Sequence, residues 1–141
     1  MTSTIKTAIR VRPLLKHERE QGHANKKLTF NQARAEVTLN DPTQQKTFRS
    51  DCLIPPEASQ DQTFSDCNIP SLVDKVFQGY NSTVFAYGQT GSGKSYTMHG
   101  GDEGEVGGIT GRVAKLLFKK ITEFKGTIRH SITISFLQIY S

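Results

Sequence analysis

The chain has 141 residues, of which 35% are hydrophobic and 22% are charged, and its formal net charge is +5. This length and balance predict one globular domain with one sizeable core, and they exclude a disordered chain. No apolar run approaches the length of a bilayer crossing, and residues 1–4 lead into an alternating strand instead of a signal peptide. We therefore expect a soluble, cytosolic protein that does not insert into membranes.

The cysteines and the basic residues give no sign of a metal or a nucleic-acid site. Cys52 and Cys67 lack metal-ligand spacing and form no C-x-x-C pair, so we predict two reduced, partly buried thiols. The mild positive charge suits an acidic partner surface. The lysines between positions 115 and 125 are more simply explained as a solvated helix face, and we expect no nucleic-acid partner.

The first predicted strand covers residues 4–12, where side chains of two kinds alternate until Pro13 ends the strand. The period of two places Arg10 and Arg12 on one face at its end. A planar guanidinium there can stack on an aromatic base or face a phosphate. Two arginines on an exposed strand are more often simply solvated, so these residues alone give a weak signal.

The next part of the chain is predicted to form small elements at an edge. Residues 14–25 are polar and charged, which indicates a surface loop or a short exposed helix without chemistry of its own. Residues 27–30 and 36–39 predict two short strands, and residues 47–54 predict another. We expect these strands to be antiparallel.

A helical region follows the two prolines at positions 55 and 56. Ser59 and Gln62 form a capping-box pattern that opens a helix, and a second helix is expected to start around Asn68. Its apolar positions recur at helical spacing until Gly79 ends it. Residues 82–87 are β-branched and aromatic, and they predict a buried strand.

A phosphate-binding pattern, G-x-x-x-x-G-K-[ST], comes directly after this predicted strand. Its residues are Gly88, Gln89, Thr90, Gly91, Ser92, Gly93, Lys94 and Ser95. The glycines let backbone N–H groups wrap a phosphate chain closely. Lys94 places a positive charge on the terminal phosphates, and the Ser95 hydroxyl is a ligand for the accompanying Mg²⁺. A helix is expected to open at Gly93 or Lys94, with its N-terminus toward the anion.

Past this loop, residues 100–108 predict a glycine-rich surface loop and residues 112–124 an amphipathic helix. The residues expected to point inward from that helix are Val113, Leu116, Leu117, Ile121 and Phe124. Residues 127–140 predict a long central strand, apolar on both faces near its end. Helices thus alternate with apolar strands, which predicts an α/β layered fold of the P-loop NTPase type, with a central mixed sheet flanked by helices.

The phosphate-binding pattern has three alternative interpretations. A chance match in a surface turn is disfavoured because strand, glycine loop and helix arrive in the required order. A GTPase or a small-molecule kinase usually carries this loop on its first strand, whereas here it begins at Gly88, after an arginine-bearing strand. A short nucleotide-binding or regulatory module is the third alternative.

Five stretches resemble the kinesin motor domain family, and together they run from one end of the chain to the other. They are residues 10–13 (RVRP), 56–60 (PEASQ), 79–98, 108–112 (GITGR) and 136–140 (FLQIY). The resemblance implies an ATPase that is stimulated by microtubules, with ATP and Mg²⁺ as cofactors, tubulin as partner and a place on the cytoskeleton. It leaves the oligomeric state open.

The resemblance also gives the weak arginine signal a role. It implies that the adenine lies between Arg10, Arg12 and Pro13 on one side and Tyr96 on the other, which stacking makes reasonable. Ser95 replaces the commoner threonine and keeps the hydroxyl that binds Mg²⁺.

The motifs that would complete the chemistry are not found after Ser95. The sequence there has no Asn-x-x-Ser-Ser-Arg and no Asp-x-x-Gly-x-Glu, the two switch elements of kinesins. We therefore interpret residues 1–141 as the N-terminal part of a motor domain with an incomplete fold. No catalytic residue is assigned in this segment, and we expect it to bind nucleotide at most, with negligible hydrolysis.

Overall fold

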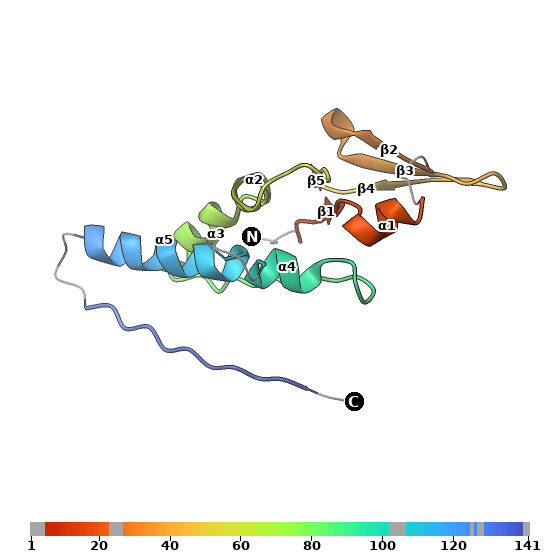
Figure 1. Ribbon diagram of the computed structural model, residues 1–141. Helices are drawn as coiled ribbons and strands as arrows, with labels where there is room; N and C mark the ends of the chain where they lie inside the picture. Colours follow the sequence, from red (N-terminus) through yellow and green to blue (C-terminus); the bar gives the residue numbers. More distant parts are fainter. Residues whose placement is uncertain (1–4, 23–26, 102–106, 125, 127–128, 140–141) are drawn as a thin grey trace.

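The computed structural model describes residues 5–22, 27–101, 107–124, 126 and 129–139, and it shows an α/β architecture (Figure 1). Strands dominate the first part of the chain and helices the second. The elements in chain order are β1 (Ala8–Arg10), α1 (Lys16–Glu20), β2 (Leu28–Asn31), β3 (Glu36–Asn40), β4 (Gln45–Arg49), β5 (Cys52–Ile54), α2 (Gln60–Asp66), α3 (Ile69–Phe77), α4 (Lys94–His99) and α5 (Ile109–Glu123).

The first strand pairs in parallel with β5, so that Ala8 lies opposite Cys52 and Arg10 opposite Ile54. It is shorter than predicted, because it begins only at Ala8 and ends at Arg10, so Arg12 lies beyond the strand. Asp51 closes the start of this pair: its carboxylate accepts hydrogen bonds from the Thr7 backbone N–H at 2.8 Å and from the Thr7 hydroxyl at 3.0 Å. The parallel pair thereby places the end of β1 beside α2 and α4.

The antiparallel sheet predicted for the edge is present, in the order β2-β3-β4, at the opposite end of the molecule from α5 (Figure 1). Val37 of β3 lies opposite both Phe30 and Phe48, and it is 6% exposed. The single strand predicted over residues 47–54 is divided at Ser50 and Asp51 into β4 and β5. The division lets one half join the antiparallel sheet and the other half join β1.

The helix signals of the middle region are confirmed. The Ser59 hydroxyl accepts from the Gln62 backbone N–H at 3.1 Å, and the side-chain Oε1 of Gln62 accepts from the Ser59 backbone N–H at 2.8 Å, so the capping box opens α2. Asn68, in a left-handed conformation, separates α2 from α3. Gly79, with φ of +89°, follows the end of α3 as predicted.

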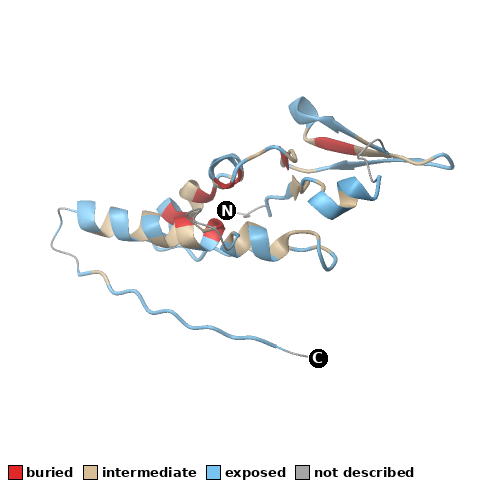
Figure 2. Cartoon of the chain, in the orientation of Figure 1, coloured by how far each residue is buried: buried red, intermediate tan, exposed pale blue. Residues whose placement is uncertain are grey.

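The apolar core is small and lies between the helices and the parallel strand pair (Figure 2). Its buried apolar residues outside β3 are Leu53, Ile54, Ile69, Val73 and Ile109. Helix α5 packs against α3 and α4, and Lys120 of α5 forms an ion pair with Asp74 of α3 at 2.6 Å. Most residues predicted to point inward from α5 are half-buried, but Phe124 is exposed; the fully buried residues are Ile109 and Arg112.

Two predicted strands are wrong. Within the described ranges, neither residues 82–87 nor residues 129–139 form a strand. The exposed fraction is 95% for Tyr87 and 91% for Phe136. An extended segment becomes a strand only when a neighbour completes its hydrogen-bond ladder, and neither segment has such a neighbour among the described residues.

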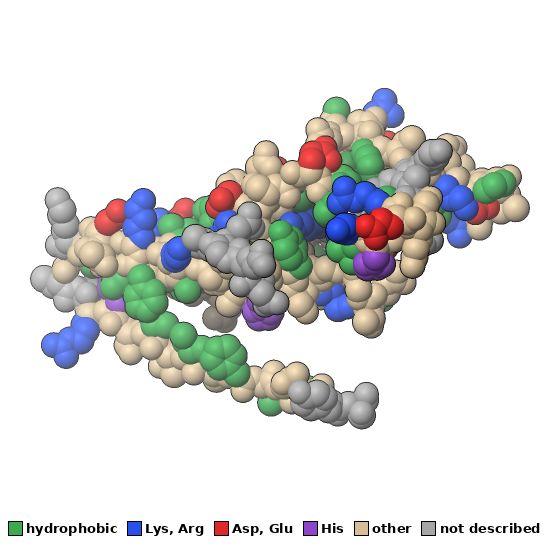
Figure 3. Space-filling view, viewed as in Figure 1, with side chains coloured by type: hydrophobic (Ala, Val, Ile, Leu, Met, Phe, Trp, Pro, Cys, Tyr) green, Lys and Arg blue, Asp and Glu red, His purple; other side chains and the backbone are tan. Residues whose placement is uncertain are grey.

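Hydrophobic side chains are exposed along the extended segment 129–139 (Figures 1 and 3). At its start the segment contacts the helices, because the His130 ring lies edge-on to Phe77 of α3 and to Phe124 at the end of α5, with ring centroids 5.8 and 4.9 Å apart. Of the predicted strand over residues 127–140, residues 127, 128 and 140 lie outside the described residues, as do residues 102–106 of the predicted glycine-rich loop.

Cys52 and Cys67 are free and half-buried, as predicted, and burial raises the pKa of the Cys67 thiol to about 11. No helix in the described part of the chain is both long and apolar enough to span a bilayer.

The Asp51 contacts predict an acid-sensitive step in stability. Hydrogen bonds from the Thr7 backbone, together with Lys6, lower the pKa of Asp51 from 3.8 to about 2. Because the folded-state pKa is lowered, the contribution of Asp51 is complete above the unfolded pKa and is lost as the pH falls from about 4 toward 2. Urea denaturation of wild type and Asp51→Asn across this range should show a smaller loss in the variant. Equal losses would contradict a role for Asp51 at the start of the sheet.

Candidate nucleotide site

The loop at residues 88–93 has the backbone geometry that its glycines allow. Gly91 and Gly93 have φ values of +79° and +96°, which are strained for any side chain larger than hydrogen. A Cβ placed on Gly88 would lie 2.5 Å from the Ser92 hydroxyl, so the chain closes tightly there. Helix α4 begins at Lys94, directly after Gly93, as predicted. The loop is therefore a tight turn that leads into a helix N-terminus.

Lys94 folds back over this loop. Its Nζ donates to the carbonyl oxygens of Gly88 at 2.8 Å and of Gln89 at 2.9 Å. Ser95 is exposed in the first turn of α4, so its hydroxyl is accessible from solvent. The structure thus gathers the lysine, the serine and the loop glycines in one place. A phosphate is a stronger acceptor for an ammonium group than these neutral carbonyls.

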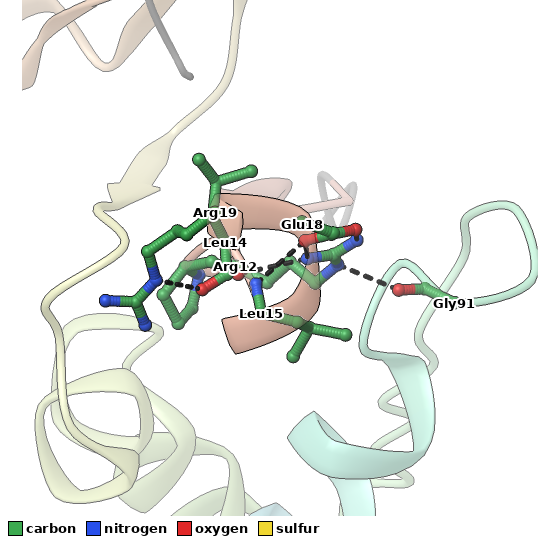
Figure 4. Close-up of polar contacts among 7 residues, drawn as sticks. Arg12, Leu14, Leu15, Glu18, Arg19 and Gly91 are labelled. Carbon is green, nitrogen blue, oxygen red and sulfur yellow. Dashed lines mark hydrogen bonds and ion pairs between the residues drawn. The ribbon is translucent and has the colours of Figure 1, made fainter. Parts of the chain in front are cut away.

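Arg12 lies against the same loop (Figure 4). Its Nε donates to the carbonyl oxygen of Gly91 at 2.9 Å, and its aliphatic part passes Gly93, where an added Cβ would lie 3.8 Å from that of Arg12. Both terminal nitrogens of the guanidinium donate to Glu18 of α1, at 2.7 and 2.5 Å. Hydrogen bonds from Arg12 lower the pKa of Glu18 to about 2, and the same contact raises that of Arg12.

Arg10 takes a different path from Arg12. Its guanidinium lies over the Tyr96 ring, 5.2 Å from the ring centroid, and donates to Gln60 at 3.1 Å and to Thr97 at 3.0 Å. Burial lowers the pKa of Arg10. Arg10 and Tyr96 therefore contact each other directly, while Arg12 and the exposed Pro13 lie on the side of the loop and α1.

Gln60 is the residue that sequence patterns missed. It is 3% exposed, and its amide accepts from Arg10 and donates to the Tyr96 carbonyl at 2.7 Å. It joins β1, α2 and α4. A polar residue in the first turn of a helix is ordinary, so its position gave no signal of burial. Its place at the end of the PEASQ stretch was the only indication.

The α/β fold and the lysine-capped glycine loop define a P-loop NTPase-type protein. The family model for the kinesin motor domain matches residues 10–141. The chain belongs to the kinesin motor domain family.

Individual relatives agree with this family. The chain is 36% identical to kinesin-related protein 8 of Dictyostelium discoideum, over 97% of this chain and 7% of that protein. It is 38% identical to kinesin-like protein 3 of Schizosaccharomyces pombe, over 99% of this chain and 25% of that protein. It is also 38% identical to the kinesin heavy chain of Gibberella moniliformis, over 98% of this chain and 15% of that protein. The chain thus spans a quarter or less of the length of these relatives.

The buried amide of Gln60 predicts a measurable loss of stability on truncation. Gln60→Ala leaves the Arg10 guanidinium and the Tyr96 carbonyl without this partner, and we expect a cost of about 2 kcal/mol in the free energy of unfolding. Urea denaturation checks this. Gln21→Ala, at an exposed position at the end of α1, is the matched control and should stay within about 0.5 kcal/mol of wild type. Equal, small effects of both changes would contradict the role of Gln60.

Proposed function

We propose that this chain binds Mg-ATP at the loop formed by residues 88–95. The observation that carries the proposal is the position of Lys94, whose ammonium is held over the loop by two carbonyl oxygens. Tight backbone closure at Gly88 and the left-handed glycines fit a phosphate chain, because they leave room for close approach of backbone N–H groups.

Each residue of the site has a distinct task in this proposal. Gly88, Gln89, Thr90, Gly91, Ser92 and Gly93 supply the backbone that surrounds the phosphates. Lys94 exchanges the Gly88 and Gln89 carbonyls for phosphate oxygens, a charge-assisted contact. The Ser95 hydroxyl is available as a ligand for Mg²⁺, whose bound charge would offset that of the phosphates.

The base is held by two planar surfaces. Tyr96 provides an aromatic face, and Arg10 supports that ring from behind through its cation–π contact. Arg12 and Pro13 form the other side of the pocket. The family resemblance implied that Arg10 and Arg12 both lie beside the adenine. In this proposal Arg10 instead supports the Tyr96 ring, and Arg12 donates a hydrogen bond to the loop.

Kinesin motor domains are microtubule-stimulated ATPases, and we propose that the protein carrying this chain is a cytoskeletal motor of that kind, with tubulin as its partner. Residues 1–141 would form the N-terminal part of its motor domain. The sequence contains no counterpart of the two switch motifs, so this segment by itself should bind nucleotide without steady turnover. The family match over residues 10–141 supports this view over a non-motor module.

Removal of the loop lysine tests the nucleotide site. Lys94→Ala deletes a charge-assisted contact to phosphate, so the dissociation constant for Mg-ATP should rise about tenfold to a hundredfold. Isothermal titration calorimetry measures the change. Lys75→Ala, which removes an exposed lysine of α3, is the matched control and should leave the affinity within about twofold.

Two results would contradict the proposal. One is equal affinity of wild type and Lys94→Ala for Mg-ATP. The other is a clear preference of the wild type for Mg-GTP in a competition titration, because that would indicate a different class of P-loop enzyme.

The wider motor function has its own test. ATP turnover by the protein that carries this chain, measured with and without polymerised tubulin, should rise several-fold in the presence of microtubules. Unchanged turnover would favour a non-motor role, even if the nucleotide site is real.

A further inference from the structure

Helix α1 is a short surface helix, yet one of its side chains pairs with Arg12, which contacts the loop of residues 88–93. Glu18 is 21% exposed, whereas Glu20 on the same helix is 64% exposed. The Glu18 carboxylate accepts hydrogen bonds from both terminal nitrogens of Arg12, and it also accepts one from the backbone N–H of Leu15 at 2.8 Å. Glu20 forms a long ion pair with Lys16, in which the Lys16 Nζ and the Glu20 Oε1 are 4.0 Å apart. Glu18 is therefore tied to Arg12 by two hydrogen bonds, whereas Glu20 has no such contact with Arg12.

The hydrogen bonds of Arg12 are nearly saturated. A guanidinium has five N–H donors in one plane. Four of them are used, by the Gly91 carbonyl, the Pro13 carbonyl and the two oxygens of Glu18. A group fixed along its edge in this way cannot rotate freely, so its plane and the position of its Nε are set by its partners.

We propose that Glu18 is a positioning residue for the nucleotide site. Glu18 accepts hydrogen bonds from both terminal nitrogens of Arg12, which leaves the Nε–H to donate to the Gly91 carbonyl. We call this Glu18–Arg12–Gly91 chain of contacts the brace, and it holds the loop that would receive the phosphates. Arg12 then has its planar face, and not its N–H edge, to offer to a base. The inference rests on the proposed function, since it states how one side of that same site is held.

The brace spans elements that are distant in the sequence. Glu18 lies on α1, Arg12 follows β1, and Gly91 lies 79 positions after Arg12, in the turn before α4. Figure 4 shows the Arg12 guanidinium bonded to Glu18 on one side and to Gly91 on another. Glu18 also caps α1 through Leu15, which fixes the carboxylate from behind. Loss of the carboxylate would thus release Arg12 while leaving the loop sequence unchanged.

Nuclear magnetic resonance of the nucleotide-free protein tests the brace directly. The Nε–H of Arg12 should give a protected signal in the wild type, because it is hydrogen-bonded to Gly91. Glu18→Gln replaces one acceptor oxygen by an amide that faces the Arg12 donors, so this signal should be lost or exchange faster. Glu20→Gln is the matched control on the same helix and should keep it. Dispersed backbone signals in each variant show that it is folded.

Nucleotide affinity gives the second measurement, through a double-mutant cycle. Glu18→Gln should raise the dissociation constant for Mg-ATP about tenfold, and Glu20→Gln should change it less than about twofold. In an Arg12→Ala background, Glu18→Gln should have little further effect, because Glu18 acts through Arg12. A residue that only stabilises α1 would show the same effect in both backgrounds.

The outcomes separate this inference from the proposed function. An Arg12 Nε–H signal that persists in Glu18→Gln, or an unchanged affinity in that variant, would overturn the positioning role. An effect that persists in full without Arg12 would overturn it as well. If the wild type does not bind Mg-ATP, the proposed function fails, and the resonance measurement still decides whether Glu18 holds Arg12 on Gly91.

Discussion

One buried amide connects the parts of the molecule that must meet at the site. Gln60 accepts a hydrogen bond from Arg10 of β1 and donates one to the Tyr96 carbonyl of α4, so it ties the helix that follows the glycine loop to the first strand. A buried amide that lacked either partner would be costly, and this makes the arrangement specific. Gln60 thereby helps to hold α4, the helix that begins at Lys94, in place.

Arg10, the last residue of β1, and Arg12, two residues further on, bind different partners, although the sequence pattern predicted one role for both. Arg10 is turned toward α2 and α4, where it supports the Tyr96 ring. Arg12 is turned toward α1 and the loop, where Glu18 and Gly91 take its donors. The strand ends at Arg10, so Arg12 lies beyond it and the predicted alternation does not fix the partners of both arginines. In the proposed base site, Tyr96 would supply an aromatic surface and Arg12 a guanidinium surface, and each has its own support from other residues.

Features set by neighbouring residues could be predicted from the sequence, whereas features that depend on contacts between distant segments could not. The capping box at Ser59 and the helix start at Lys94 depend on neighbours within a few residues, and both are confirmed. The strands expected at residues 82–87 and 127–140 depend on pairing partners far away in the sequence, so hydrophobicity and β-branching alone did not decide their state. The burial of Gln60 and the Glu18 pairing depend equally on tertiary contacts, and no periodicity reveals them. The phosphate-loop pattern can be read from the sequence because its residues are consecutive, and its role in binding phosphate stays a prediction.

A structure of the protein with Mg-ATP bound would test the central claim most directly. The phosphates are expected within the loop of residues 88–95, with the Nζ of Lys94 moved from the Gly88 and Gln89 carbonyls to phosphate oxygens. The adenine is expected beside Tyr96. Nucleotide bound elsewhere, or a Lys94 that keeps both carbonyl contacts beside a bound phosphate chain, would contradict the assignment of this loop as the nucleotide site.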